Sequence, residues 1–157
     1  MVTVEFLTRT RRWSVAATVL LCLWLFGNLY EEVVWIPQLI ADPRPGTLVG
    51  ALALGSPVYY YLPWAPVSLV LTVVLRVRFG PAAPPRVRRA WTAAIAALVV
   101  AVLGKIGLIT LVNPVFRDPA AAPEVVHDRA VLWAVGNGVV LVAVAIALVL
   151  LTAWRRP

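Results

Sequence analysis

Residues 13–36 read WSVAATVLLCLWLFGNLYEEVVWI, and this stretch decides the class of the protein. It is long enough to cross the roughly 30 Å hydrocarbon core of a bilayer as one helix, which takes about 20 apolar residues. Arginines precede it, as in a signal peptide, but no Ala-x-Ala cleavage site follows and its apolar character continues to Trp35. We therefore expect a retained transmembrane helix that stops at Pro37.

Three further apolar runs follow, at about 59–76, 90–113 and 129–154. The fourth helix is expected to begin at 129 or earlier, near Pro123, because proline is favoured at the first helical position. In the outer loop 37–58, residues 47–55 are expected to form a short interfacial or re-entrant piece. With 62% hydrophobic residues, against about half in a soluble domain, the sequence predicts an all-α polytopic membrane protein, with one four-helix bundle over residues 1–157.

The arginines lie mostly at the ends of the apolar runs, where they indicate orientation. Most of the 14 basic residues fall before the first run, between the second and third, or after the fourth. By the positive-inside rule these segments face the cytoplasm, so both termini of a multi-pass cell-membrane protein are expected there. Trp13, Trp91 and Trp154 fall at the same boundary, as an aromatic belt predicts. A net charge of +7 distributed in this way does not favour a nucleic-acid partner.

Several polar side chains fall at a similar depth in the predicted helices. At 1.5 Å per residue from the nearest cytoplasmic arginine, Glu31 lies at ~29 Å, Lys105 at ~24 Å and Asn137 at ~27 Å. All three are therefore expected in the outer half of the bilayer, where charge is costly and usually serves a function. Polar or aromatic residues recur every three or four positions along these helices, so they share faces. We expect a polar pocket between the helices that opens to the outer side.

The candidate site residues form two groups. The predicted catalytic residues are Glu31, Glu32, Lys105 and His127. The predicted substrate-binding residues are Trp24, Asn28, Tyr60, Tyr61, Trp64, Asn113, Trp133 and Asn137. In the catalytic interpretation a glutamate is the acid or base, and Lys105 tunes it or stabilises an oxyanion. Structural roles compete with each of these: a buried ion pair that fixes helix register, asparagines that join helices, tryptophans that pack, and a lone interfacial histidine.

The sequence does not identify a cofactor. The single cysteine, Cys22, excludes an internal disulfide, a CxxC redox motif and a cysteine-based zinc site. One histidine with a few acids is a thin ligand set, so no metal site is predicted, and copper or non-haem iron is only a weak exception. The sequence has no Walker A, GxGxxG or serine-hydrolase motif. The expected partners are membrane lipids and a lipophilic small molecule, without nucleic acid, and a homo-oligomer is left open.

Four short motifs carry a family resemblance. The first helix ends with Gly27, Tyr30, Glu31 and Pro37, the second run opens with proline, the third ends in Thr110-Leu-Val-Asn113-Pro114, and the fourth carries Trp133 with Asn137 one turn on. In this order they resemble the anthrone-oxygenase-like family of small four-helix membrane proteins. The resemblance implies oxidation of a lipophilic aromatic substrate by a protein that need not hold an organic cofactor tightly. Family members often have His or Arg soon after that tryptophan, whereas this chain has Gly136, Asn137 and Gly138.

Three classes of function stay open from the sequence. The first is an enzyme that acts on a lipophilic aromatic or polyene substrate, either oxygenase-like or of the membrane terpene-cyclase type, in which a carboxylic acid protonates and aromatic faces stabilise cations. The second is a small proton-coupled exporter with a membrane glutamate, although the charge bias is strong and no inverted repeat is visible. The third is a non-catalytic membrane subunit whose polar groups join helices.

Overall fold

The computed structural model describes residues 4–48, 59 and 62–153. Within them the chain is all-α and contains four helical segments that are long and apolar enough to cross a membrane, which confirms the predicted class. In chain order the elements are α1 (Val4–Tyr30), the π-helical turn η1 (Glu31–Trp35), α2 (Ile36–Ala41), α3 (Trp64–Val74), the π-helical turn η3 (Leu75–Phe79), the 3-10 turn η4 (Gly80–Ala82), α4 (Pro85–Gly107), the π-helical turn η5 (Leu108–Val112), α5 (Asn113–Arg117) and α6 (Pro123–Ala153).

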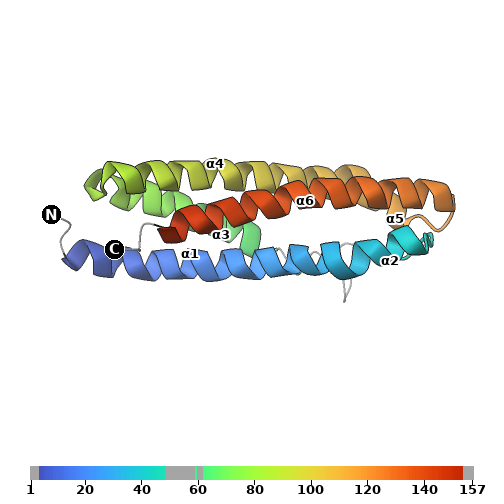
Figure 1. Ribbon diagram of the computed structural model, residues 1–157, viewed down its shortest axis with the longest axis horizontal. Helices are drawn as coiled ribbons and strands as arrows, with labels where there is room; N and C mark the ends of the chain where they lie inside the picture. Colours follow the sequence, from blue (N-terminus) through green and yellow to red (C-terminus); the bar gives the residue numbers. More distant parts are fainter. Residues whose placement is uncertain (1–3, 49–58, 60–61, 154–157) are drawn as a thin grey trace.

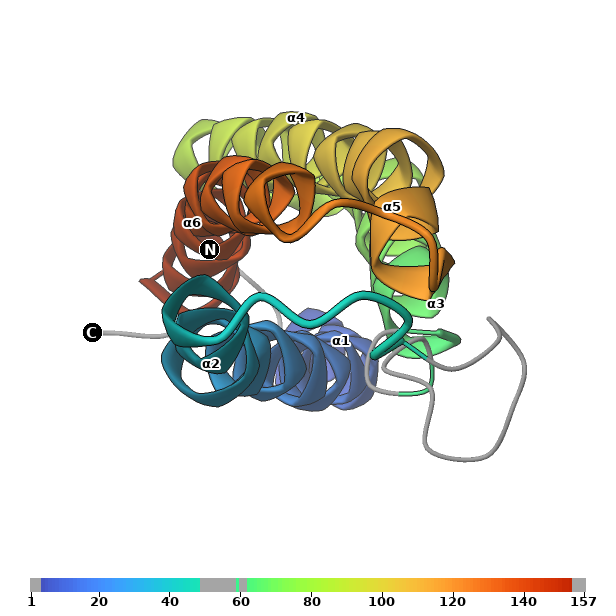
Figure 2. The same cartoon turned by 90° about the vertical axis from the view of Figure 1, so that its right-hand side faces the viewer.

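The four segments form an elongated bundle (Figures 1 and 2). α4 packs on α6, and α1 packs on α3 and α6. One end of the bundle holds the start of α1, the start of α4 and the end of α6, and we call it the basic end because Arg11, Arg12, Arg86, Arg88 and Arg89 lie there. The other end holds α2 and α5, and we call it the α2 end.

The first helical segment does not stop at Pro37, contrary to the prediction. It continues as α2 to Ala41. In the π-helical turn just before the proline, the N–H of Ile36 donates to the carbonyl of Glu31, five residues back. Proline usually breaks a helix because it lacks an N–H and its ring collides with the carbonyl four residues back. The wider turn relieves that collision, so the helix passes through the proline.

The third segment repeats this solution at Pro114, which was also predicted to end a helix. The N–H of Asn113 donates to the carbonyl of Leu108, again five residues back, and the helix continues to Arg117. Two of the expected helix ends were therefore too early for the same reason. A π-helical turn satisfies the backbone locally, which a membrane segment requires because lipid offers no hydrogen bonds.

Helix starts also differ from the expected positions. α3 begins at Trp64 rather than 59, directly after Pro63, and α4 begins at Pro85 rather than 90. α6 begins at Pro123, the earlier of the two predicted starts. In each case proline lies at or near the first turn, where its missing N–H costs nothing. Of the predicted interfacial piece 47–55, all but the first two residues lie outside the described part of the chain.

The buried side chains of three helices recur at alternating intervals of three and four residues. The buried series are Thr10, Ser14, Ala17, Leu21, Trp24, Asn28 and Glu31 on the first segment, Val87, Trp91, Ala94, Leu98, Ala101, Lys105, Leu108 and Val112 on the third, and Val126, Ala130, Trp133, Asn137, Val140, Val144, Ala147 and Leu151 on the fourth. This spacing of about 3.5 is the heptad pattern of knobs-into-holes packing. The other helix faces expose valine, leucine and phenylalanine, as lipid contact requires.

At one level of the bundle the heptad pattern brings together polar core residues from three different helical segments. Glu31, Lys105 and Asn137 form what we call the polar layer. An apolar cluster that includes Leu21 and Leu98 fills the core toward the basic end, and a second cluster that includes Phe116 and Trp133 fills it toward the α2 end. The polar layer therefore lies between two apolar cores.

Candidate functional site

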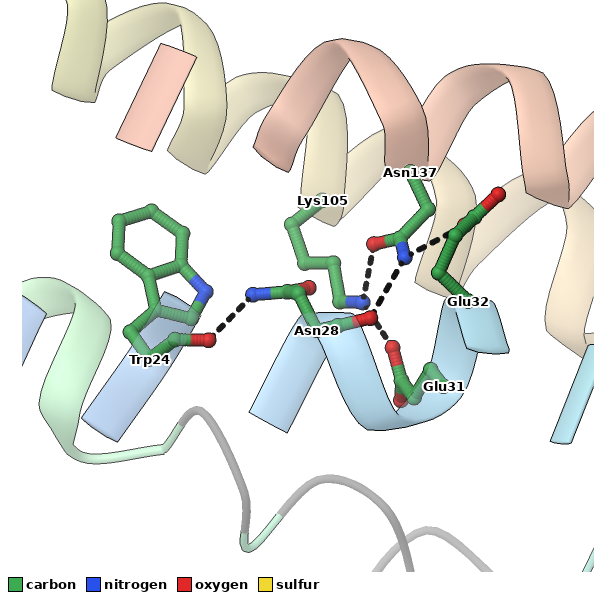
Figure 3. A network of polar contacts seen from close by, with 6 residues as sticks. All are labelled: Trp24, Asn28, Glu31, Glu32, Lys105 and Asn137. Carbon is green, nitrogen blue, oxygen red and sulfur yellow. Dashed lines mark hydrogen bonds and ion pairs between the residues drawn. The ribbon is translucent and has the colours of Figure 1, made fainter. Parts of the chain in front are cut away.

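The polar layer is a hydrogen-bonded network that joins three helical segments (Figure 3). Lys105 Nζ, on α4, donates to Glu31 Oε2 at 2.5 Å, within an ion pair. It also donates to Asn137 Oδ1, on α6, at 3.1 Å. The amide nitrogen of Asn137 donates in turn to Glu32 Oε2 at 3.0 Å and to the carbonyl of Asn28 at 3.1 Å. Asn137 therefore bridges the ammonium and the second carboxylate.

Burial makes this network energetically important. Glu31 is 1% exposed, Lys105 4% and Asn137 0%, whereas Glu32 is only half-buried. Taking an isolated charge into a low-dielectric interior costs several kcal/mol, so each buried charge needs a partner. Several atoms at or beside the network are buried without a hydrogen-bond partner among the described residues: Glu31 Oε1, Asn28 Oδ1 and the indole nitrogen of Trp133. Glu31 thus has one oxygen fixed by Lys105 and one buried oxygen without a partner among the described residues.

The local sequence explains how two adjacent glutamates reach one network. In an α-helix neighbouring side chains point about 100° apart, so Glu31 faces the core while Glu32 lies at its edge. The π-helical turn begins at Glu31. One turn earlier, the side-chain amide nitrogen of Asn28 donates to the backbone carbonyl of Trp24 at 2.8 Å. The backbone carbonyl of Asn28 accepts from the side chain of Asn137. The sequence correctly grouped these residues on one stripe.

Two glycines let α4 and α6 approach closely on either side of the polar layer. A Cβ at Gly104 would lie 3.2 Å from Val140 Cγ2, and a Cβ at Gly136 would lie 2.7 Å from Leu108 Cδ2. Small residues at membrane helix contacts permit this kind of close backbone packing. The hydrogen bond from Lys105 to Asn137 spans this contact between α4 and α6. The small residues of the third run, Gly104 among them, predict this close approach from the sequence, whereas the role of Gly136 was not predicted.

An aromatic cluster covers the network on the side of the α2 end. Lys105 Nζ lies 4.7 Å from the centre of the Trp133 ring, a cation–π distance. Trp133 makes edge contacts with Trp35 and Phe116, with ring centroids 6.2 and 6.4 Å apart, and those two rings are 5.6 Å from each other. Trp133 was predicted. Phe116 was missed because it follows Pro114, where the predicted helix ends.

Other predicted site residues lie away from the network. His127 Nδ1 lies 3.1 Å from the carbonyl of Ile40, and His127 is ten residues from Asn137, or ~15 Å along α6. Trp64 lies at the start of α3 and lines a groove between α1 and the chain that leads into α3. Asn113 is buried at the start of α5, and its Oδ1 has no partner among the described residues. Tyr60 and Tyr61 lie outside the described residues.

The space around the network differs from the single chamber that was expected. Direct contacts of 2.5 and 3.1 Å leave no room for a ligand atom between Lys105 and the side chains of Glu31 and Asn137. A groove of about 460 Å³ lies at the α2 end, and its lining includes Trp35 and Leu39. The exposed ion pair of Arg44 with Asp42 lies at its rim, and the hydrogen bond and charge of that carboxylate raise the pKa of Arg44 above its usual value.

A second groove of about 290 Å³ lies between α1 and the chain that leads into α3. Its lining residues are Leu23, Phe26, Gly27, Tyr30, Tyr59 and Trp64. We call it the aromatic groove. Across residues 4–48, 59 and 62–153, no group of three or more His, Cys, Asp or Glu side chains is arranged to hold a metal ion.

No protein-family model, curated protein or solved structure matches the chain. The likeness to the anthrone-oxygenase-like family thus rests on the short motifs alone. What the site does must be argued from its geometry.

Proposed function

We propose that the protein is a small integral membrane enzyme that performs acid–base chemistry on a lipophilic molecule, with Glu31 as the proton-accepting group. The observation that carries this proposal is that the two oxygens of the Glu31 carboxylate have different surroundings. Glu31 Oε2 is held by Lys105, and Oε1 is buried without a partner among the described residues. A general base needs this combination of fixed orientation and an open lone pair.

Each residue of the network has a different role in the proposed reaction. Glu31 Oε1 accepts a proton from an O–H or an acidic C–H bond of the substrate, and the electron pair of that bond stays on the substrate as an oxyanion or enolate. The Lys105 ammonium stabilises this negative charge in a medium of low dielectric constant. Asn137 is a positioning residue, because it holds Lys105 from one side and Glu32 from the other. Half-buried Glu32 is the nearest acid through which the proton can leave.

The chemistry fits an oxygenase-like enzyme better than a cyclase. A terpene-cyclase-type reaction starts from a protonated carboxylic acid, whereas an ammonium 2.5 Å from Glu31 pairs with a carboxylate. Loss of an acidic O–H or C–H proton from an aromatic substrate leaves its electron pair on the substrate as an electron-rich anion. This agrees with the activity implied by the family resemblance, and it assigns no cofactor.

A non-catalytic membrane subunit is the second candidate, and one observation favours it. The three residues of the polar layer occupy heptad core positions and contact each other directly. Polar groups at core positions fix the register and pairing of helices even where they have no other role. Under that account the network has no substrate.

Three variants separate the two accounts. Glu31→Gln removes the base, Glu32→Gln is the matched neighbour, and the double variant Glu31→Met/Lys105→Met restores an apolar core. Lipophilic metabolites in cells that produce each variant are compared by liquid chromatography–mass spectrometry, together with protein stability. The enzyme account predicts that the double variant is stable but produces no product. A stable double variant with wild-type function would overturn it and favour the subunit.

We also propose that the basic end faces the cytoplasm, which places both termini there. The support is the concentration of arginines at that end of the bundle, as the positive-inside rule requires. Reporter fusions at each terminus test this orientation. Activity of an extracytoplasmic reporter at either terminus would contradict it.

A further inference from the structure

We propose that the aromatic groove is the lipid-side binding site for the planar, unsaturated part of the substrate. This inference rests on the proposed function, and it adds the place and the chemical class of the ligand. The groove lies on the outside of the bundle, and two of its rings, those of Phe26 and Tyr30, are more than half exposed. A ligand can therefore reach it from the bilayer without entering water.

The position of Gly27 connects this groove to the active site. Gly27 lines the groove, and it lies one turn before Glu31, about 40° away around the helix. Helical side chains lean toward the N-terminal end of their helix, so the Glu31 side chain leans toward the turn that precedes it, where Asn28 lies (Figure 3). Because Gly27 has no side chain, nothing from that position stands between the groove and the base.

The lining defines the chemistry of the occupant. Four aromatic residues line the groove, namely Phe26, Tyr30, Tyr59 and Trp64, and none of its six lining residues in the described part of the chain is charged. Aromatic faces stack on flat unsaturated systems, each pair adding to simple burial of apolar area. The groove volume of about 290 Å³ falls at the lower end of the range for small-molecule pockets. It fits a compound of a few fused rings rather than a whole phospholipid.

A second lipid-facing groove supplies the internal control. It lies on α6 and is lined by Val135, Gly138, Val139, Val142, Ala143 and Ile146, without an aromatic ring. It has its own glycine, since a Cβ at Gly138 would meet nothing within 4 Å. Any hydrophobic compound dissolved in the bilayer reaches both grooves, so only specific binding distinguishes them.

The test is photolabelling of the full-length protein in lipid nanodiscs with 1-azidonaphthalene, followed by mass spectrometry of the labelled peptides. The proposal predicts saturable labelling of residues 23–30 that unlabelled naphthalene displaces. Gly27→Leu fills the groove and should reduce that labelling about tenfold, and Phe26→Leu, which removes one exposed ring, by about two- to tenfold. Gly138→Leu should leave it unchanged. Equal, unsaturable labelling of both grooves, or labelling of residues 23–30 that survives both Gly27→Leu and Phe26→Leu, would overturn the proposal.

The outcome is separable from that of the proposed function. Glu31→Gln should keep the labelling of residues 23–30 while it abolishes product formation. Labelling that is lost in Gly27→Leu, combined with normal turnover in Glu31→Gln, would support the groove and refute Glu31 as the base. Loss of turnover in Glu31→Gln, combined with no specific labelling of residues 23–30, would support Glu31 as the base and refute the groove as the binding site.

Discussion

The apolar core near the basic end and the polar layer share the same heptad packing, but one fills its core positions with apolar side chains and the other with polar ones. Near the basic end the heptad positions hold residues such as Leu21, Leu98 and Val144. About two turns further along, the same positions hold a carboxylate, an ammonium and an amide, equally buried. In a membrane the apolar half gains little from burial alone, because lipid is as apolar as leucine. The comparison teaches that the polar layer, with its directional bonds, carries specificity that the apolar half does not supply.

Removal of one charge should give the largest effect. Lys105→Met leaves Glu31 beside an apolar side chain, and an unpaired charge at mid-helix costs about 2.5–3.5 kcal/mol. Leu98→Met, the matched change in the apolar half, should cost less than about 1.5 kcal/mol. Unfolding by SDS in mixed micelles measures both. The double variant Glu31→Met/Lys105→Met should regain most of the loss, and a double variant no more stable than Lys105→Met would show that the two side chains are not coupled.

A larger side chain at the close contact between α4 and α6 should give the second-largest loss of stability. Gly136→Ala places a Cβ 2.7 Å from the Leu108 side chain, which must shift at a cost of about 1–3 kcal/mol. Gly138→Ala meets nothing and is the control. The same unfolding assay measures both variants. Equal stabilities for the two would contradict the close approach beside the polar layer.

Deleting the bridging amide should have a moderate effect. Asn137→Leu removes its bonds to Lys105, Glu32 and the α1 backbone, and interhelical hydrogen bonds in membranes contribute about 0.6–1.7 kcal/mol. The loss should be smaller than in Lys105→Met, because the ion pair survives. A greater loss than in Lys105→Met would place the amide, rather than the pair, at the centre of the network.

The aromatic cover should give the smallest change. Phe116→Leu removes two edge contacts, to Trp35 and Trp133, and aromatic pairs contribute about 0.5–1.5 kcal/mol beyond burial. Because the cluster only borders the polar layer, the Lys105–Glu31 pair should persist in this variant. Loss of the pair on this substitution would mean that the cover, and not the polar bonds, holds Lys105 in place.

The sequence predicted the four long apolar helical segments well, because they follow from hydropathy over stretches long enough to span a bilayer. The depth of the polar side chains in the bilayer stays a prediction. It misplaced the helix ends at Pro37 and Pro114, since a π-helical turn is a local adjustment that composition does not reveal. It grouped Glu31, Lys105 and Asn137, which the structure brings into contact, yet it also included His127, ~15 Å along α6 from Asn137, and Trp64, which lines the aromatic groove instead. The level of a residue along its own helix follows from the sequence, whereas side-chain contacts between helices depend on how the helices are rotated about their axes.

The Lys105–Glu31 bond is the central claim, and the chain allows a direct test because Lys105 is its only lysine. Protein labelled with ¹⁵Nζ-lysine and ¹³Cδ-glutamate in lipid bilayers gives a single side-chain lysine signal for a solid-state NMR distance measurement. We predict strong dipolar dephasing of that signal in the wild type, retained in Glu32→Gln and abolished in Glu31→Gln. Absence of dephasing in the wild type, or its persistence in Glu31→Gln, would contradict the account.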